Sequence, residues 1–166
     1  LHVVRLMIGG KIQNYRNILR RYIRDYGENE DINRAVQVLE RAKRDVLKAQ
    51  DKTELIGYEG MASNAYFEVL PILILNQKTD FPFHGRNRRP PKDAVNAMLS
   101  FAYTLIANDV AAALETVGLD PYVGFLHTLR PGRTSLALDM MEELRAYLGD
   151  RFILSLINKR QISVKD

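Results

Sequence analysis

The chain has 166 residues and a mass of 19.0 kDa, with 46% hydrophobic and 27% charged residues, which is the composition of one globular domain with a packed core and excludes disorder as its main state. Its formal net charge of +4 allows a polyanionic partner without requiring one. The absence of cysteine excludes disulfides, thiolate metal sites and a cysteine nucleophile.

The same sequence predicts a cytoplasmic protein without a membrane partner. Its longest uninterrupted apolar run, VLPILIL over residues 69–75, is far shorter than the ~20 residues needed to cross a bilayer, and we find no signal peptide. Missing cysteines fit a reducing compartment. The chain opens on Leu1 rather than Met, so we expect a fragment of a longer polypeptide.

Helical periodicity dominates the first half of the chain. Apolar residues recur at spacings of three and four, which predicts helices over residues 11–26 and 32–49, with Asp31 as the N-cap of the second. Thr53 is expected to cap a third helix, which runs through ELIGYEGMASNAYFEVLPILI and is disturbed near Pro71.

The second half continues in the same way after a proline-rich loop over residues 77–93. The most apolar helix is expected over residues 94–118, closed by Gly118, and is expected to be central in the bundle. Two further helices are predicted over residues 135–148 and 151–159. No strand-type alternation is visible, so the predicted fold class is all-α, a helical bundle in one domain over residues 1–166.

The helix after residue 134 carries an acidic group whose setting is unusual. Asp139, Glu142 and Glu143 project from one side of this helix and are interleaved with apolar residues, so at least one carboxylate lies near the buried boundary. Three cations could compensate it: Arg145, the helix dipole acting on Asp139, or a metal ion. A solvated acidic face beside a core histidine remains the alternative.

A metal ion would need further ligands, and two residues elsewhere qualify. His127 ends a short apolar stretch just before this helix, and Glu59 lies between Gly57 and Gly60, although each glycine costs a helix about 1 kcal/mol relative to alanine. Bare backbone around an acid suits the close approach of a ligand or a nucleic-acid strand, whereas tight helix packing is the alternative. Two carboxylates and an imidazole would suit Mn²⁺ or Mg²⁺.

Basic residues cluster in the loop HGRNRRPPK and again beside His127. Such a loop can be a solvated linker, but arginine also grips phosphate groups bidentately, and a metal ringed by arginines is what phosphodiester chemistry requires. A small-molecule metallohydrolase is disfavoured, because no histidine follows a glutamate by three residues. The candidate phosphate contacts are Arg86, Arg88, Arg89, Arg130 and Arg133.

Four stretches together resemble one known family, that of the CRISPR-associated integrase Cas1, the endonuclease subunit of the spacer-acquisition complex in antiviral defence. They are GKIQNYRNILRR, GYEGMASNAYF, FHGRNRRPPKDAVNAMLSFAYTLI and GLDPYVGFLHTLRPGRTSLALDMMEELR, in the family's order and closest to its type I variants. The resemblance implies that Glu59, His127 and Glu142 are the metal ligands, that Asp139 is a nearby catalytic acid, and that Arg145 matches a basic position.

The resemblance also implies a set of partners and a reaction. Family members use Mg²⁺ or Mn²⁺, form homodimers and join a small second Cas subunit to capture short DNA duplexes, whose 3′-hydroxyl attacks the CRISPR repeat by transesterification. They carry an N-terminal β-rich domain and a C-terminal continuation that this sequence lacks, so it is expected to be the catalytic half, truncated at both ends. A non-catalytic DNA-binding or assembly module is the alternative function.

Overall fold

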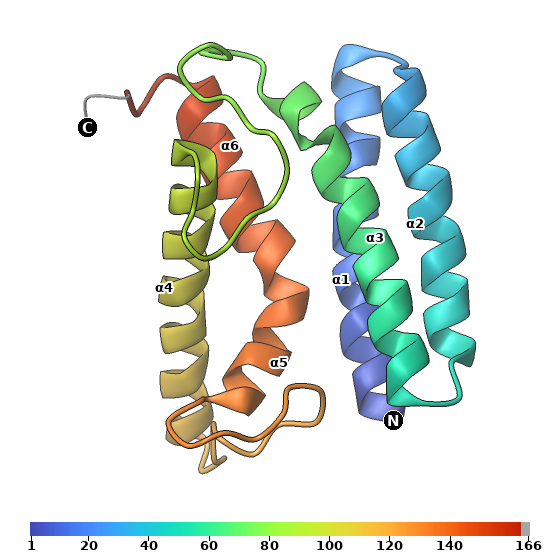
Figure 1. The fold of residues 1–166 in the computed structure, drawn as a ribbon, viewed down its shortest axis with the longest axis vertical. Coiled ribbons are helices and arrows are strands. Elements are labelled where there is room, and N and C mark those ends of the chain that lie inside the picture. Colours follow the sequence, from blue (N-terminus) through green and yellow to red (C-terminus); the bar gives the residue numbers. More distant parts are fainter. Residues whose placement is uncertain (164–166) are drawn as a thin grey trace.

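The structure is a computed structural model in which residues 1–163 are described, and in those residues every regular element is helical. The all-α prediction is therefore confirmed. Figure 1 shows two groups of helices side by side. The first group contains α1 (His2–Tyr26), α2 (Glu30–Lys48) and α3 (Lys52–Leu73); the second contains α4 (Ala94–Thr116), α5 (Ser135–Leu144), the π-helical segment η1 (Arg145–Asp150) and α6 (Arg151–Asn158).

The first group is held by apolar stripes that follow the helical period. On α1 and α2 the buried positions recur every three or four residues, as in Ile8, Ile12, Tyr15 and Leu19. The rings of Tyr15 and Tyr66 stack with their centroids 3.9 Å apart, which joins α1 to α3 in the centre of the core.

The boundaries of these helices correct three predictions. α1 begins at His2 rather than near residue 11, because the preceding segment also carries buried apolar side chains such as Val4. The side chain of Asn29, not that of Asp31, caps α2. Asp51, not Thr53, caps α3 by accepting a hydrogen bond from the backbone of Glu54. For α2 and α3, a second residue with a suitable capping side chain stands close to the predicted one.

The second group contains one continuous helical run where the sequence predicts two helices. α5 passes into η1 and then α6 without a break, so Gly149 lies inside the π-helical segment rather than after a helix end. The wider π-helical turn brings this glycine against an aromatic ring of α4: a Cβ at residue 149 would lie 2.9 Å from the Tyr103 ring. The glycine thus permits close packing.

α4 lies at the edge of the molecule, which corrects the prediction that it is the central helix (Figure 1). It packs against α5, η1 and α6, and Phe101 on its outer face is 66% exposed. By length and composition α4 could cross a membrane: its most apolar 18-residue stretch has a mean hydropathy of 1.4, and 22% of that stretch is buried. The core helices of soluble proteins pass the same test, so this is weak evidence for a membrane span. The longest uninterrupted apolar run in the sequence does not reveal this helix.

α1 is the element that joins the two groups. It packs against α2 and α3 on one side and against α5 and η1 on the other. The loop over residues 77–93 contains neither helix nor strand, as predicted, and is anchored by the buried rings of Phe81 and Phe83. The seam between the helix groups, along α1, is where the side chains of chemical interest meet.

Two glycine substitutions test the packing at the π-helical segment. Gly149→Ala is expected to lower the free energy of unfolding by about 1–3 kcal/mol, because the added methyl group overlaps the Tyr103 ring. Gly57→Ala in α3 is the matched control, since a Cβ there meets nothing within 4 Å. It should raise stability by up to about 1 kcal/mol through helix propensity. Urea unfolding measures both, and equal effects of the two would contradict the packing argument.

Candidate functional site

The three residues proposed as metal ligands line one cavity. Its volume is about 260 Å³, and its walls come from α1, α3, α5, the loop over residues 77–93 and the loop before α5. Glu59 reaches it from α3, Glu142 from α5 and His127 from the loop. The structure therefore brings together residues that are up to 83 positions apart in the sequence, from 59 to 142.

Lys11 of α1, which the sequence reasoning missed, lies between the two carboxylates. Its side chain is 1% exposed, and its Nζ forms ion pairs with Glu59 Oε1 and, at 2.6 Å, with Glu142 Oε2. Each carboxylate has a second partner: Ser63 Oγ donates to Glu59 at 2.7 Å, and Arg145 donates to Glu142 Oε1 at 2.7 Å. The ammonium group thus compensates two acids from different helices.

The charges of this cluster depend on one another. Burial acts to raise the pKa of Glu142, but Lys11 and Arg145 outweigh it and hold that pKa below its ordinary value. The pKa of Glu59 is lowered in the same way, with Lys11 overcoming burial. Burial would lower the pKa of Lys11, yet the neighbouring groups, both carboxylates among them, raise it. All three side chains are therefore charged at neutral pH.

Asp139 is fully buried and holds the loop that carries His127. Its Oδ2 accepts from the backbone N–H groups of Phe125 (2.5 Å) and Leu126 (2.8 Å), and its Oδ1 from the backbone N–H of His127 at 2.9 Å. Burial raises its pKa, but these bonds and the His127 side chain lower it below its ordinary value. A Cβ at Gly124 would lie 2.7 Å from Asp139 Oδ2, so the loop needs a glycine there.

The imidazole of His127 is oriented by the same carboxylate. Its Nδ1 lies 2.6 Å from Asp139 Oδ1, which leaves Nε2 as the ring nitrogen for another ligand. A carboxylate behind a histidine is the usual arrangement for fixing the ring of a metal-binding imidazole. Asp139 therefore positions His127, and both carboxylate oxygens of Asp139 are occupied by hydrogen bonds.

The interpretation as a solvated acidic face is wrong for two of the three acids on this helix. Asp139 and Glu142 are buried, and only Glu143 is exposed. Arg145, one of the cations considered from the sequence, does compensate a buried acid, because it forms an ion pair with Glu142. Its guanidinium carbon also lies 4.7 Å from the centroid of the Tyr103 ring.

The proposed phosphate contacts fall into three groups. Arg88 and Arg133 line the cavity. Arg89 and Arg130 are exposed on their loops outside it. Arg86 is turned inward: it donates to Asn96 Oδ1 at 2.8 Å and Ser100 Oγ at 3.1 Å, so its guanidinium holds the loop onto α4.

The backbone beside Glu59 is open. A Cβ at Gly57 or Gly60 would meet nothing within 4 Å outside its own helix, which removes tight helix packing as the reason for these glycines. The surface next to the carboxylate is therefore bare backbone that a ligand can approach.

The donor set suits a divalent cation only if Lys11 moves. Two carboxylates and a free imidazole nitrogen are suitable ligands for Mn²⁺ or Mg²⁺, and the ammonium of Lys11 shows that the acids already hold a cation between them. Within residues 1–163, however, no three His, Asp or Glu side chains lie close enough to hold an ion as they stand. The side chains are therefore of the types that bind a divalent metal ion, and the ammonium group of Lys11 occupies the position between the two carboxylates.

A third buried acid, Asp150, lies in the core of the molecule. It is fully buried and accepts a hydrogen bond from Tyr103 through Oδ1. Burial raises its pKa to about 6, although hydrogen bonding from Tyr103 opposes this. Its charged form is therefore disfavoured in the folded protein.

Comparison with known proteins identifies relatives of the whole chain. The sequence model of the family described as "CRISPR associated protein Cas1" matches residues 1–166. The chain is 47% identical to the CRISPR-associated endonuclease Cas1 of Leptospira interrogans, over 100% of this chain and 66% of the relative. It is 50% identical to one from Chlorobaculum tepidum, over 99% of this chain and 49% of the relative. It therefore spans between about half and two thirds of these relatives.

Solved structures agree with the sequence comparison. A Cas1 protein from Thermotoga maritima is 29% identical with a TM-score of 0.79, and the match covers 99% of this chain and 50% of that one. A casposase bound to integration product is 27% identical with a TM-score of 0.78, covering 99% and 44%. A chain of a Cas6-RT-Cas1–Cas2 complex is 27% identical with a TM-score of 0.85, covering 99% and 17%.

The raised pKa of Asp150 predicts a pH-dependent stability. An acid whose pKa is higher in the folded state stabilises the fold below its ordinary pKa of 3.8, and this contribution is lost as the pH rises through about 6. Asp150→Asn removes the titration, so between pH 4 and 7 the variant should gain up to about 3 kcal/mol relative to wild type. Urea unfolding across this range measures the difference. Exposed Asp109→Asn is the control, and a pH-independent difference for Asp150→Asn would refute the prediction.

Proposed function

The chain belongs to the Cas1 family, and from that premise we propose that it is the helical catalytic part of a metal-dependent DNA endonuclease and integrase of CRISPR adaptation. The observation that carries the proposal is the meeting of Glu59, Glu142 and His127 in one cavity edged by Arg88 and Arg133. Ligands for a cation and groups for phosphate are thus adjacent, as phosphodiester chemistry requires.

In this proposal Glu59, Glu142 and His127 Nε2 hold Mg²⁺ or Mn²⁺. When bound, such an ion activates the attacking oxygen and neutralises charge on the reacting phosphate. The contribution of the protein is orientation: Asp139 fixes the ring and the loop of His127, while Arg145 keeps Glu142 ionised. Arg88 and Arg133 supply guanidinium groups for the phosphates beside the reacting one.

The proposed substrates and partners are those of the family. In the cytoplasm of a prokaryote, a homodimer of the complete protein and a small second Cas subunit would capture a short DNA duplex. Its 3′-hydroxyl attacks a phosphodiester of the CRISPR repeat: a new P–O bond forms, the bond to the leaving 3′-oxygen breaks, and the proton passes from the attacking to the leaving oxygen. Support comes from relatives described as a Cas1–Cas2 assembly and as an enzyme bound to integration product.

One observation favours the alternative of a non-catalytic DNA-binding or assembly module. Lys11 satisfies both carboxylates, so the acids could serve only as internal ion-pair partners. The two functions differ in their dependence on metal, because a binding module needs none.

The metal-ligand assignment predicts the effect of removing a carboxylate. In the full-length protein, Glu142→Gln and Glu59→Gln should each lower Mn²⁺-dependent cleavage of DNA by at least about 100-fold, because a ligand is lost while the side-chain shape is kept. Binding of DNA in EDTA should remain. Exposed Glu143→Gln is the matched control on α5. Undiminished metal-dependent cleavage by Glu142→Gln would show the assignment to be wrong, and a wild-type protein that binds but never cleaves would favour the alternative.

The position of Lys11 predicts a competition between the ammonium group and the metal. Lys11→Met leaves two carboxylates without their shared cation, which should lower the stability of the metal-free protein by about 3–5 kcal/mol. Mn²⁺ can replace the missing charge, so the Mn²⁺-induced rise in Tm should be larger in the variant than in wild type. Calorimetry with and without Mn²⁺ measures the two shifts. Lys43→Met on α2 removes the same charge outside the cavity, and equal shifts in all three proteins would contradict the competition.

A further inference from the structure

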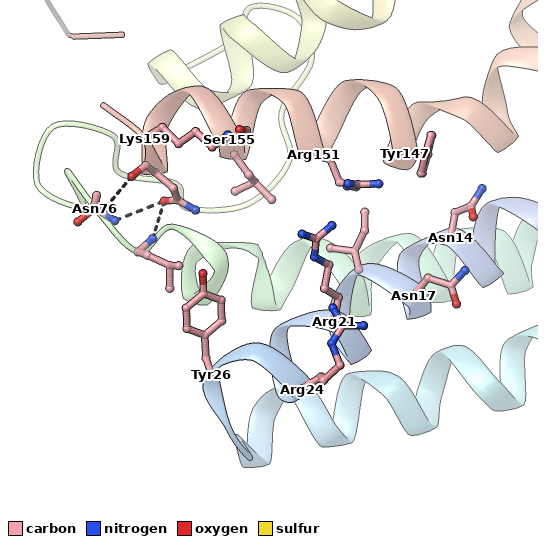
Figure 2. A pocket seen from close by; sticks show the side chains of 14 residues that line it. Asn14, Asn17, Arg21, Arg24, Tyr26, Asn76, Tyr147, Arg151, Ser155 and Lys159 are labelled. Atoms are coloured by element: carbon pink, nitrogen blue, oxygen red, sulfur yellow. Dashed lines mark hydrogen bonds between the residues drawn. The ribbon is translucent and has the colours of Figure 1, made fainter. Parts of the chain in front are cut away.

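A second and larger cavity lies on the same seam, farther along α1. Its volume is about 740 Å³, within the range of ligand pockets, and it is bounded by the second half of α1, the segment after α3, and η1 with α6. Figure 2 shows Arg21 and Arg24 on α1 and Arg151 on the facing α6, with Lys159 at the end of that helix. Four cations line the cavity, and none of its lining residues is acidic.

The positive charge of this cavity is only partly compensated. Arg21 and Arg24 share one carboxylate, that of Asp25, at 3.3 Å and 2.8 Å. Among residues 1–163, no ion pair is present for Arg151 or Lys159. Like charges facing one cavity destabilise a fold, and an anion in the space between them would relieve the repulsion.

The end wall of the cavity is fixed by hydrogen bonds, so it does not need to form around a ligand. The side chain of Asn158 accepts from the backbone N–H of Leu75 at 2.8 Å and donates to the carbonyl of Leu73 at 2.9 Å. The side chain of Asn76 donates to the carbonyl of Asn158 at 2.6 Å (Figure 2). These bonds tie α6 to the segment after α3 and make the cavity a preformed site.

Two exposed tyrosines give the cavity aromatic surfaces as well as charge. Tyr147 is 55% exposed and Tyr26 is 63% exposed, and the Arg151 guanidinium lies 4.8 Å from the Tyr147 ring centroid. Guanidinium groups together with exposed rings are what a single nucleic-acid strand requires, since phosphates bind the cations and unpaired bases stack on the rings. An acidic peptide would use the cations but not the rings.

We propose that this cavity binds a single DNA strand, with phosphates on Arg21 and Arg151 and a base stacked on Tyr147. The choice of DNA as the ligand rests on the proposed function. Asn14 lines this cavity and donates to the backbone carbonyl of Glu143 at 2.9 Å, next to Glu142 of the first cavity. Lys11 and Arg21 are ten residues apart, or about 15 Å along the helix. The strand would thus run along α1, a few nucleotides from the acids.

Fluorescence anisotropy with a labelled oligo-dT in EDTA tests the proposal on the full-length protein. Arg21→Ala/Arg151→Ala should weaken binding at least about tenfold, and the plot of log K against log salt should become flatter by about 0.7 for each phosphate that the protein no longer neutralises. Arg20→Ala/Arg41→Ala removes the same two charges outside the cavity and should leave both quantities near wild type. Equal weakening of binding in the two double variants would overturn the proposal.

Variants of Tyr147 distinguish binding of a DNA strand from binding of other anions. Tyr147→Ala should weaken oligonucleotide binding about fivefold or more without changing the slope of log K against log salt. Tyr147→Phe should bind the oligonucleotide as wild type does, because stacking needs the ring alone. If polyglutamate binds wild type as tightly as the oligonucleotide does, and Tyr147→Ala has no effect, the DNA assignment is overturned. The binding assay contains EDTA and no metal, so it does not depend on metal-dependent cleavage. Failure of the proposed enzyme activity would appear in the Mn²⁺ cleavage assay, and failure of the proposed strand site would appear in the binding assay.

Discussion

A single buried ammonium group connects the parts of this protein that matter for its chemistry. Lys11 pairs with an acid of α3 and an acid of α5, and it comes from α1, which packs against helices of both groups. Breaking a buried ion pair by removing one partner is costly, because the remaining charge stays out of water. The arrangement of α1, α3 and α5 is therefore linked electrostatically to the state of Glu59 and Glu142.

The sequence reveals the acids but not their partner. Glu59 and Glu142 attract notice because they interrupt apolar or glycine-rich patterns, and the structure places both in one cavity. Lys11 follows two glycines at a position typical of the start of a solvated helix, and nothing local shows that it is 1% exposed. A buried lysine is recognisable only when its acids, which come from other helices, are known to converge on it.

Periodicity predicted most helices, and its failures have local physical causes. The sequence does not identify the caps of α2 and α3 correctly, because several residues able to cap a helix stand close together, as Asn29 and Asp31 do. The break expected at Gly149 is absent because a glycine that usually ends a helix serves here for close approach of Tyr103. The apolar composition of α4 predicts a central position, but the outer face of α4 is exposed, because composition does not say which face is covered.

The bonds of Asp139 have a consequence for how the cavity lined by Glu59, His127 and Glu142 can change its shape. They attach His127 to α5, the helix that carries Glu142, so the positions of these two residues are tied together. Glu59 lies in the other helix group, on α3. Sliding one group against the other would alter the separation of Glu59 from Glu142 while leaving that of His127 from Glu142 unchanged. One wall of the cavity therefore carries two linked residues, His127 and Glu142, and the opposite wall carries Glu59 alone among the three.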